Sequence, residues 1–252
     1  MAASGLNLIQ ITDTHIPAAP GIDVGGGDPA ANLARVLAHA RAEGWPPQAV
    51  LATGDLAYDG TEPCYRRLRP MLVELGVPVF LVPGNHDDPA LMARTLAGGA
   101  VRAEAQWSAG GWRLVFLDTS VPGVDHGHLG PERLAALDSL LGSRRTQPVL
   151  VVLHHNPVPT GSGADTSLLQ DRTALFEVLD RHAQVRGVAW GHIHCAFDAE
   201  RRGVRLMGTP SSWRQFPVTP GTVACMEPVP GYRRLTLEPD GTIRTRVVWL
   251  PA

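Results

Sequence analysis

Five short apolar runs, each followed within three residues by Asp, Asn or His, constrain the fold of this chain more than any other feature. The runs are rich in β-branched residues and are bounded by polar residues, Gly or Pro, which is typical of buried strands. They are residues 8–11 before Asp13 and His15, 50–52 before Asp55, 79–82 before Asn85, 149–153 before His154, and 188–190 before His192 and His194. Because open α/β sheets bind ligands at the carboxyl ends of their strands, we expect these polar side chains to share one site.

Helical patterns separate these predicted strands. Apolar residues recur at helical spacing in segments 28–44, 131–142, 171–182 and 63–75, and we expect Pro70 to kink or split the last of these helices. Strands that alternate with helices predict an α/β fold. Segments 232–237 and 242–249 flank a turn signal, which predicts a C-terminal antiparallel β-hairpin. No repeat or linker divides the chain, so we expect one domain over residues 1–252, with a hairpin of about 231–250 packed on it.

Composition indicates an ordinary enzyme body. The chain has 252 residues, of which 44% are hydrophobic, which is enough to bury a sizeable core. Its formal net charge of −2 gives no electrostatic reason to expect nucleic acid or an anionic membrane as a partner. Neither a signal peptide nor a membrane-spanning stretch is recognisable, so we expect a cytoplasmic protein. Cys64, Cys195 and Cys225 are irregularly spaced and odd in number, which favours reduced thiols.

The residue types in the clusters predict a catalytic metal site. Carboxylate, imidazole and amide oxygen together suit Mn²⁺, Fe or Zn²⁺ better than Ca²⁺ or a thiolate-bound structural zinc. With four neutral histidines, one Asn and two carboxylates, two divalent ions would leave about two net positive charges, which attract an anion. Two metals roughly 3.5–4 Å apart can activate a bridging water and grip phosphate oxygens, so the pattern predicts phosphoester hydrolysis. Asp55 is the natural bridging ligand, and Gly54 beside it lets the backbone turn closely past the ions.

This series of motifs resembles the calcineurin-like metallophosphoesterase superfamily over residues 8–194. Segments 117–123, 153–159 and 209–216 extend the resemblance to bacterial class III 3′,5′-cyclic AMP phosphodiesterases. The resemblance implies a four-layer αββα sandwich of two mixed β-sheets flanked by helices. It also implies that one metal is held by Asp13, His15, Asp55 and His194, and the other by Asp55, Asn85, His154 and His192.

The histidine that follows Asn85 has a separate predicted role. His86 matches the non-ligand histidine of the family, and we expect it to protonate the leaving oxygen as general acid, with Asp87 orienting its ring. The alternative is that His86 only positions Asn85. His155 follows a ligand in an extended segment, so we expect it to face away from the metals in a structural role. The residues expected to contact substrate are His15, Asn85, His86 and His194.

The predicted function is a binuclear-metal phosphodiesterase that converts 3′,5′-cyclic AMP to 5′-AMP by attack of a metal-bound hydroxide. The catalytic residues are then Asp55 and His86, the cofactors are two divalent ions, Fe²⁺ or Mn²⁺ with Zn²⁺ as a further option, and the partner is a small phosphodiester. The chain is expected to be a monomer or a homodimer. One alternative is a broader enzyme for glycerophosphodiesters or 2′,3′-cyclic nucleotides, because a bimetal core has no inherent substrate choice. Another is a non-catalytic protein-binding scaffold of the same fold.

Four further residues bear on the substrate. Trp213 and Phe216 either stack on a purine or pack the end of a strand. Tyr58 and Asn156 depart from the residues that are usual in the family, without replacing a predicted metal ligand.

Overall fold

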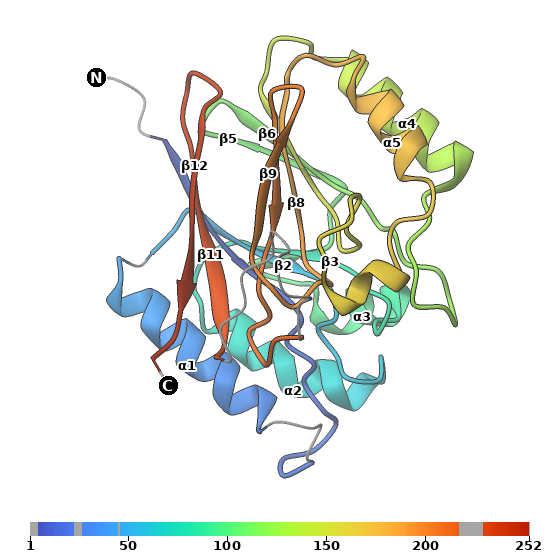
Figure 1. Cartoon of the computed structure of the whole chain (residues 1–252). Helices are drawn as coiled ribbons and strands as arrows, with labels where there is room; N and C mark the ends of the chain where they lie inside the picture. Colours follow the sequence, from blue (N-terminus) through green and yellow to red (C-terminus); the bar gives the residue numbers. More distant parts are fainter. Residues whose placement is uncertain (1–4, 23–26, 45, 217–228, 252) are drawn as a thin grey trace.

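Two six-stranded β-sheets form the centre of the molecule (Figure 1). The computed structural model describes residues 5–22, 27–44, 46–216 and 229–251. The first sheet has the order β12-β11-β1-β2-β3-β4 and the second the order β5-β6-β7-β8-β10-β9. The strands of the first sheet are β1 (Leu6–Ile11), β2 (Ala49–Thr53), β3 (Val79–Val82), β4 (Val101–Arg102), β11 (Gly231–Leu237) and β12 (Ile243–Trp249). Those of the second are β5 (Gln106–Ala109), β6 (Trp112–Phe116), β7 (Val149–Val152), β8 (Val185–Trp190), β9 (Phe197–Arg201) and β10 (Val204–Gly208).

Both sheets are mixed, but the strands that precede the polar clusters are parallel within each sheet. Strands β1, β2 and β3 pair in parallel, and so do β7 and β8. The antiparallel strands lie toward the edges, where the hairpin of β11 and β12 joins β1 and where β5 and β9 close the second sheet. The carboxyl ends of the parallel strands therefore meet at one edge of each sheet.

Helices cover the outer face of each sheet and complete four layers (Figure 1). The first sheet packs on α1 (Pro29–Ala42), α2 (Glu62–Val73) and α3 (Pro89–Leu96) through one apolar cluster. The second sheet packs on α4 (Gly130–Gly142) and α5 (Arg172–Leu179) through another. A third cluster, which includes Phe80, Trp112 and Leu235, fills the space between the sheets. The predicted αββα sandwich of two mixed sheets is confirmed.

The chemistry of the helix ends explains why these elements begin where they do. Asp28 and Asp88 cap α1 and α3, because their carboxylates accept the backbone N–H of Ala30 and Leu91, each at 2.9 Å. Of the two outcomes predicted for Pro70, a kink or a split, the split is wrong, since α2 continues through Pro70 to Val73. Pro70 lies in the last turn, so only three residues of helix follow it.

The structure also bears on the predictions for the C-terminal hairpin, for membrane spans and for the cysteines. The terminal hairpin is present as β11 and β12, with Leu237 opposite Ile243 at its closed end. No helix within the described residues combines the length and the apolar character that crossing a bilayer requires. Cys64 and Cys195 are buried thiols that form no disulfide in this part of the chain, and Cys225 lies outside the described residues.

Candidate metal centre

The seven predicted metal ligands meet where the two sheets present the carboxyl ends of their parallel strands. Those of the first sheet follow β1, β2 and β3, and those of the second follow β7 and β8. Six of the seven are at most 6% exposed, and Asn85 is half-buried. The chain thus brings together all the residues of this set, from the first sheet Asp13, His15, Asp55 and Asn85, and from the second sheet His154, His192 and His194.

The backbone at this junction is strained. Positive φ angles occur at six non-glycine residues in the described part of the chain, and five of these are predicted ligands: Asp13, His15, Asp55, His192 and His194. Such conformations cost roughly 1–3 kcal/mol each and persist only where the surroundings enforce them. Backbone hydrogen bonds help to hold these conformations. The N–H of Asp13 donates to the carbonyl oxygen of Gly54, and the N–H of His15 donates to the carbonyl oxygen of Asp55, each at 2.9 Å. The strain is concentrated where the side chains converge.

One group of possible metal-binding atoms surrounds a first candidate metal position. Atoms of Asp13, His15 and His194 that could each bind one metal lie within 4.8 Å of one another. The Nε2 of His194 is 3.3 Å from a carboxylate oxygen of Asp13 and 3.2 Å from the Nε2 of His15. Two imidazoles and a carboxylate that converge in a buried space make a site for a cation, because without one the polar groups face each other unshielded.

A second group of donors lies beside the first. The Nε2 of His154 is 3.3 Å from the amide oxygen of Asn85 and 3.4 Å from Oδ1 of Asp55. The other carboxylate oxygen of Asp55, Oδ2, is 3.7 Å from the Nε2 of His15 in the first group. Asp55 therefore offers one oxygen to each group. A carboxylate in this position fits the bridge between two divalent cations.

Hydrogen bonds on the outer nitrogens of His154 and His194 fix which atom of each ring faces the site. The Nδ1 of His154 lies 2.8 Å from the carbonyl oxygen of Thr53, and the Nδ1 of His194 lies 2.8 Å from that of Arg214. A carbonyl only accepts, so each Nδ1 carries a proton, and each Nε2 presents a lone pair inward when the ring is neutral. The donor set and its orientation both fit a pair of transition-metal ions.

Burial and charge set the protonation of the cluster. Burial lowers the pKa of His15 to about 3 and that of His192 to about 4, so both rings are neutral at pH 7. Burial acts the same way on His154, but the adjacent Asp55 carboxylate outweighs it and raises the pKa of His154 to about 9. Burial alone would raise the pKa of Asp55, yet His154 holds it well below the usual range. In the metal-free cluster at neutral pH, the proton therefore rests on His154.

This protonation predicts pH-dependent metal binding. A cation at the second position must displace the His154 proton, so the affinity for Mn²⁺ is expected to rise about tenfold per pH unit between pH 6.5 and 8. The gain should level off as the pH passes about 9. Calorimetric titration at pH 7 in two buffers of different ionisation enthalpy should show about one proton released. Binding of two ions without proton release would contradict this reading of His154.

Two glycines allow the loops to approach this closely. A Cβ at Gly54 would overlap the His154 ring, and Gly54 also has φ of 95°. A Cβ at Gly84 would overlap the Asp55 carboxylate and come within 2.8 Å of the His154 Nε2. The sequence interpretation of Gly54 as a close-approach residue agrees with this geometry.

His86 lies at the exposed mouth of the site. Its Nδ1 is 2.7 Å from the backbone carbonyl oxygen of Tyr58, and its ring centre is 4.8 Å from that of His15. The expectation that Asp87 orients the His86 ring is wrong. The buried Asp87 carboxylate instead accepts the backbone N–H groups of Leu56, Ala57 and Gly84 and the Tyr65 hydroxyl, and so ties the two loops together.

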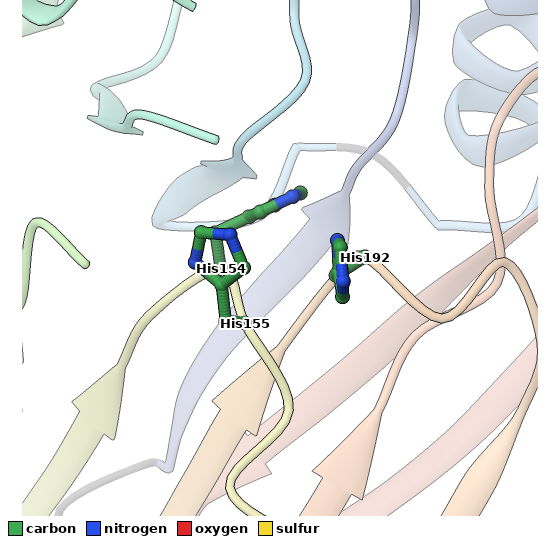
Figure 2. A group of neighbouring side chains, drawn as sticks. All are labelled: His154, His155 and His192. Atoms are coloured by element: carbon green, nitrogen blue, oxygen red, sulfur yellow. The ribbon is translucent and has the colours of Figure 1, made fainter. Parts of the chain in front are cut away.

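His155 does not face away from the site as alternation in a strand predicts. Figure 2 shows His154 and His155 side by side on the loop after β7, with His192 on the loop after the neighbouring strand β8. The ring centre of His155 is 4.9 Å from that of His154 and 4.8 Å from that of His192. Strand β7 ends at Val152, so the alternation no longer applies. Its Nδ1 is 2.7 Å from the Thr119 hydroxyl, and its buried Nε2 has no hydrogen-bond partner among the described residues.

A cleft of about 520 Å³ opens over the two groups. Phe216 lines it and stacks on His194, with ring centres 3.9 Å apart. Trp213 is buried and packs beside His15, so of the two aromatic residues it is Phe216 that is available at the cleft. Residues that sequence reasoning missed also line the cleft, and these are Asp125, Gly163, Ala164 and Ser167. Their segments carry no strand-end pattern that could have marked them.

Comparison with known proteins agrees with this geometry. The sequence profile of the calcineurin-like phosphoesterase family matches residues 6–196. The chain belongs to this family. A 3′,5′-cyclic adenosine monophosphate phosphodiesterase, CpdA of Pseudomonas aeruginosa, is 36% identical over 241 residues, which are 95% of this chain and 88% of that protein. A 3′,5′-cyclic-nucleotide phosphodiesterase of Nostoc is 35% identical over 98% of this chain and 93% of its own length.

Solved structures of the same fold include a dimetal phosphatase from Danio rerio. It superposes with a TM-score of 0.69 at 16% sequence identity and covers 93% of each chain. At that identity the likeness concerns the fold alone. The chain thus belongs to a family of phosphoesterases, and its described residues include buried groups of His and Asp that could hold a metal ion.

Proposed function

We propose that this chain is a metal-dependent phosphodiesterase that hydrolyses 3′,5′-cyclic AMP to 5′-AMP. The observation that carries the proposal is Asp55, whose two carboxylate oxygens lie within 3.7 Å of histidine nitrogens from separate donor groups. Two relatives named as cyclic nucleotide phosphodiesterases, each at least 35% identical over nearly the whole chain, support the substrate. A non-catalytic scaffold would not need five buried metal-binding side chains on strained backbone.

The residues that would hold the two ions follow from the two groups. We assign Asp13, His15 and His194 to the first ion, Asn85, His154 and His192 to the second, and Asp55 to both. Bound divalent ions would neutralise phosphate charge and supply a hydroxide nucleophile at neutral pH. Mn²⁺ or Fe²⁺ suits this mixture of oxygen and nitrogen donors, and Zn²⁺ is compatible with it.

The side chains around the cleft then act on the phosphodiester. His15, Asn85, His86 and His194 line the cleft, and we expect them to contact the phosphate. His86 is held through Nδ1 by the Tyr58 carbonyl, so its Nε2 is the atom that can pass a proton to the departing 3′-oxygen.

Features of the cleft suit an anionic nucleotide. With two divalent ions and two ligand carboxylates, the cluster would carry about two net positive charges and attract the single negative charge of a cyclic phosphodiester. Phe216 offers an aromatic face beside the donor groups, and stacking of a base on such a face is worth about 1–3 kcal/mol. Phosphate binding and base stacking can thus occur within one cleft.

Parallel rates on several substrates test the proposal. The Mn²⁺-loaded protein should hydrolyse 3′,5′-cyclic AMP with a higher kcat/KM than 2′,3′-cyclic AMP, a glycerophosphodiester or bis(p-nitrophenyl) phosphate. If 3′,5′-cyclic AMP is among the poorest of these substrates, the cyclic AMP assignment is wrong and the broader phosphodiesterase is favoured.

A further inference from the structure

His192 differs from the other histidines of the centre in how its outer nitrogen is held. The outer nitrogens of His154 and His194 are bonded to backbone carbonyls, which no substitution removes. The outer nitrogen of His192 is Nε2, and its partner is the side-chain hydroxyl of Ser167 at 3.0 Å. This bond leaves Nδ1 as the nitrogen with which His192 can bind a metal, whereas His154 and His194 present Nε2.

The hydrogen bonds of Ser167 define the tautomer of His192. The Ser167 hydroxyl can donate one proton, and the carbonyl oxygen of Ala164 lies 3.2 Å away as an acceptor. Once the hydroxyl proton points at Ala164, its oxygen accepts from the Nε2–H of His192. The proton then sits on Nε2, and Nδ1 keeps the lone pair that a metal requires.

Ser167 is in turn fixed to the loop that carries His154. It directly follows the short 3₁₀ helix η1 (Gly163–Thr166), in which the carboxylate of Asp165 accepts the backbone N–H groups of Thr160 and Gly161. Asp165 also accepts from the side-chain amide of Asn156, 3.1 Å away and two residues beyond His154. The segment 156–167 is thus tied back on the strand end that bears the second donor group.

We propose that Ser167 is a positioning residue for the second metal, because it holds His192 in the tautomer and ring orientation that present Nδ1 to Asn85 and His154. This inference rests on the proposed two-metal function. It also gives Asn156 a role, since the Asn156 amide supports the turn that places Ser167.

Metal binding to Ser167→Ala tests the proposal without any activity assay. Titration of the metal-free wild type with Mn²⁺ should resolve two binding events, and Ser167→Ala should weaken one of them by about 10–100-fold and leave the other unchanged. Ser167→Thr keeps the hydroxyl and should restore wild-type affinity. Thr166→Ala is the matched control, because the Thr166 hydroxyl is exposed and donates to the carbonyl oxygen of Gly163 on the same turn.

A variant of a proposed metal ligand shows which of the two metal positions Ser167→Ala weakens. Asn85→Ala should weaken the same binding event, and the double variant should lose less affinity than the sum of the two single losses. Wild-type affinity at both positions in Ser167→Ala would overturn the inference, and so would equal losses in Thr166→Ala. A wild type that binds fewer than two ions would instead refute the proposed function itself.

Discussion

Replacing Asp55 by Asn is expected to lower kcat for 3′,5′-cyclic AMP by about 10³-fold or more, because metal assistance is worth several kcal/mol of transition-state stabilisation. The substitution keeps the size of the side chain and removes its charge and one of its two oxygen donors. The remaining oxygen can serve one donor group but not both, since Oδ1 faces His154 and Oδ2 faces His15. Metal analysis should accordingly find fewer than two ions per chain in the variant.

Asp59→Asn is the matched control for this prediction. Asp59 lies four residues further along the same segment, is exposed, and bonds Thr61 and Cys64 rather than the donor groups. We expect it to retain two ions and a kcat close to that of the wild type. An Asp55→Asn variant that keeps two tightly bound ions and most of its kcat would contradict the bridging role.

Replacing His86 by Ala is expected to reduce kcat on 3′,5′-cyclic AMP by about 10²–10⁴-fold, the usual contribution of a general acid. His86 is the exposed member of one candidate metal group, and its partners there, His15 and Asp55, remain in the variant together with the other buried donors, so the metal content should not change. The loss should be much smaller on bis(p-nitrophenyl) phosphate, since p-nitrophenolate leaves without protonation. The ratio of the two losses therefore reports the acid role directly.

The same comparison separates the two roles considered for His86. If His86 only positioned Asn85, both substrates would lose rate equally and metal affinity would fall with them. Tyr58→Ala is a control for the hydrogen bond that holds the His86 ring. The Nδ1 of His86 bonds the backbone carbonyl oxygen of Tyr58, and the substitution removes only the Tyr58 side chain. We expect Tyr58→Ala to keep the acid role, and a loss as large as that of His86→Ala would argue against the assignment.

The donor cluster could be predicted because it depends on strand ends alone. Strands β1, β2, β3, β7 and β8 are buried apolar runs that periodicity reveals, and parallel pairing places the residue after each run at a common edge. The same logic failed for His155, since the strand ends at Val152 and the backbone beyond it no longer alternates. It also failed for Asp87, whose partners are backbone N–H groups that no residue pattern shows.

The remainder of the site depends on tertiary contacts. Ser167 reaches His192 only because Asp165 folds its segment against Thr160 and Asn156. Those bonds join side chains to turn backbone in a segment with neither helical nor strand periodicity. A sequence pattern can place the residues that follow a strand, but it does not place a loop that is held by such bonds.

The most direct test of the central claim is the product formed from 3′,5′-cyclic AMP by the purified, Mn²⁺-loaded protein. Separation of the reaction mixture over time should show 5′-AMP as the product, formed at a rate that falls in Asp55→Asn and His86→Ala but not in Asp59→Asn. Intact 3′,5′-cyclic AMP in a sample that holds two ions per chain and cleaves bis(p-nitrophenyl) phosphate would contradict the cyclic AMP assignment. Formation of 3′-AMP instead would contradict the assignment of the 3′-oxygen as the leaving group.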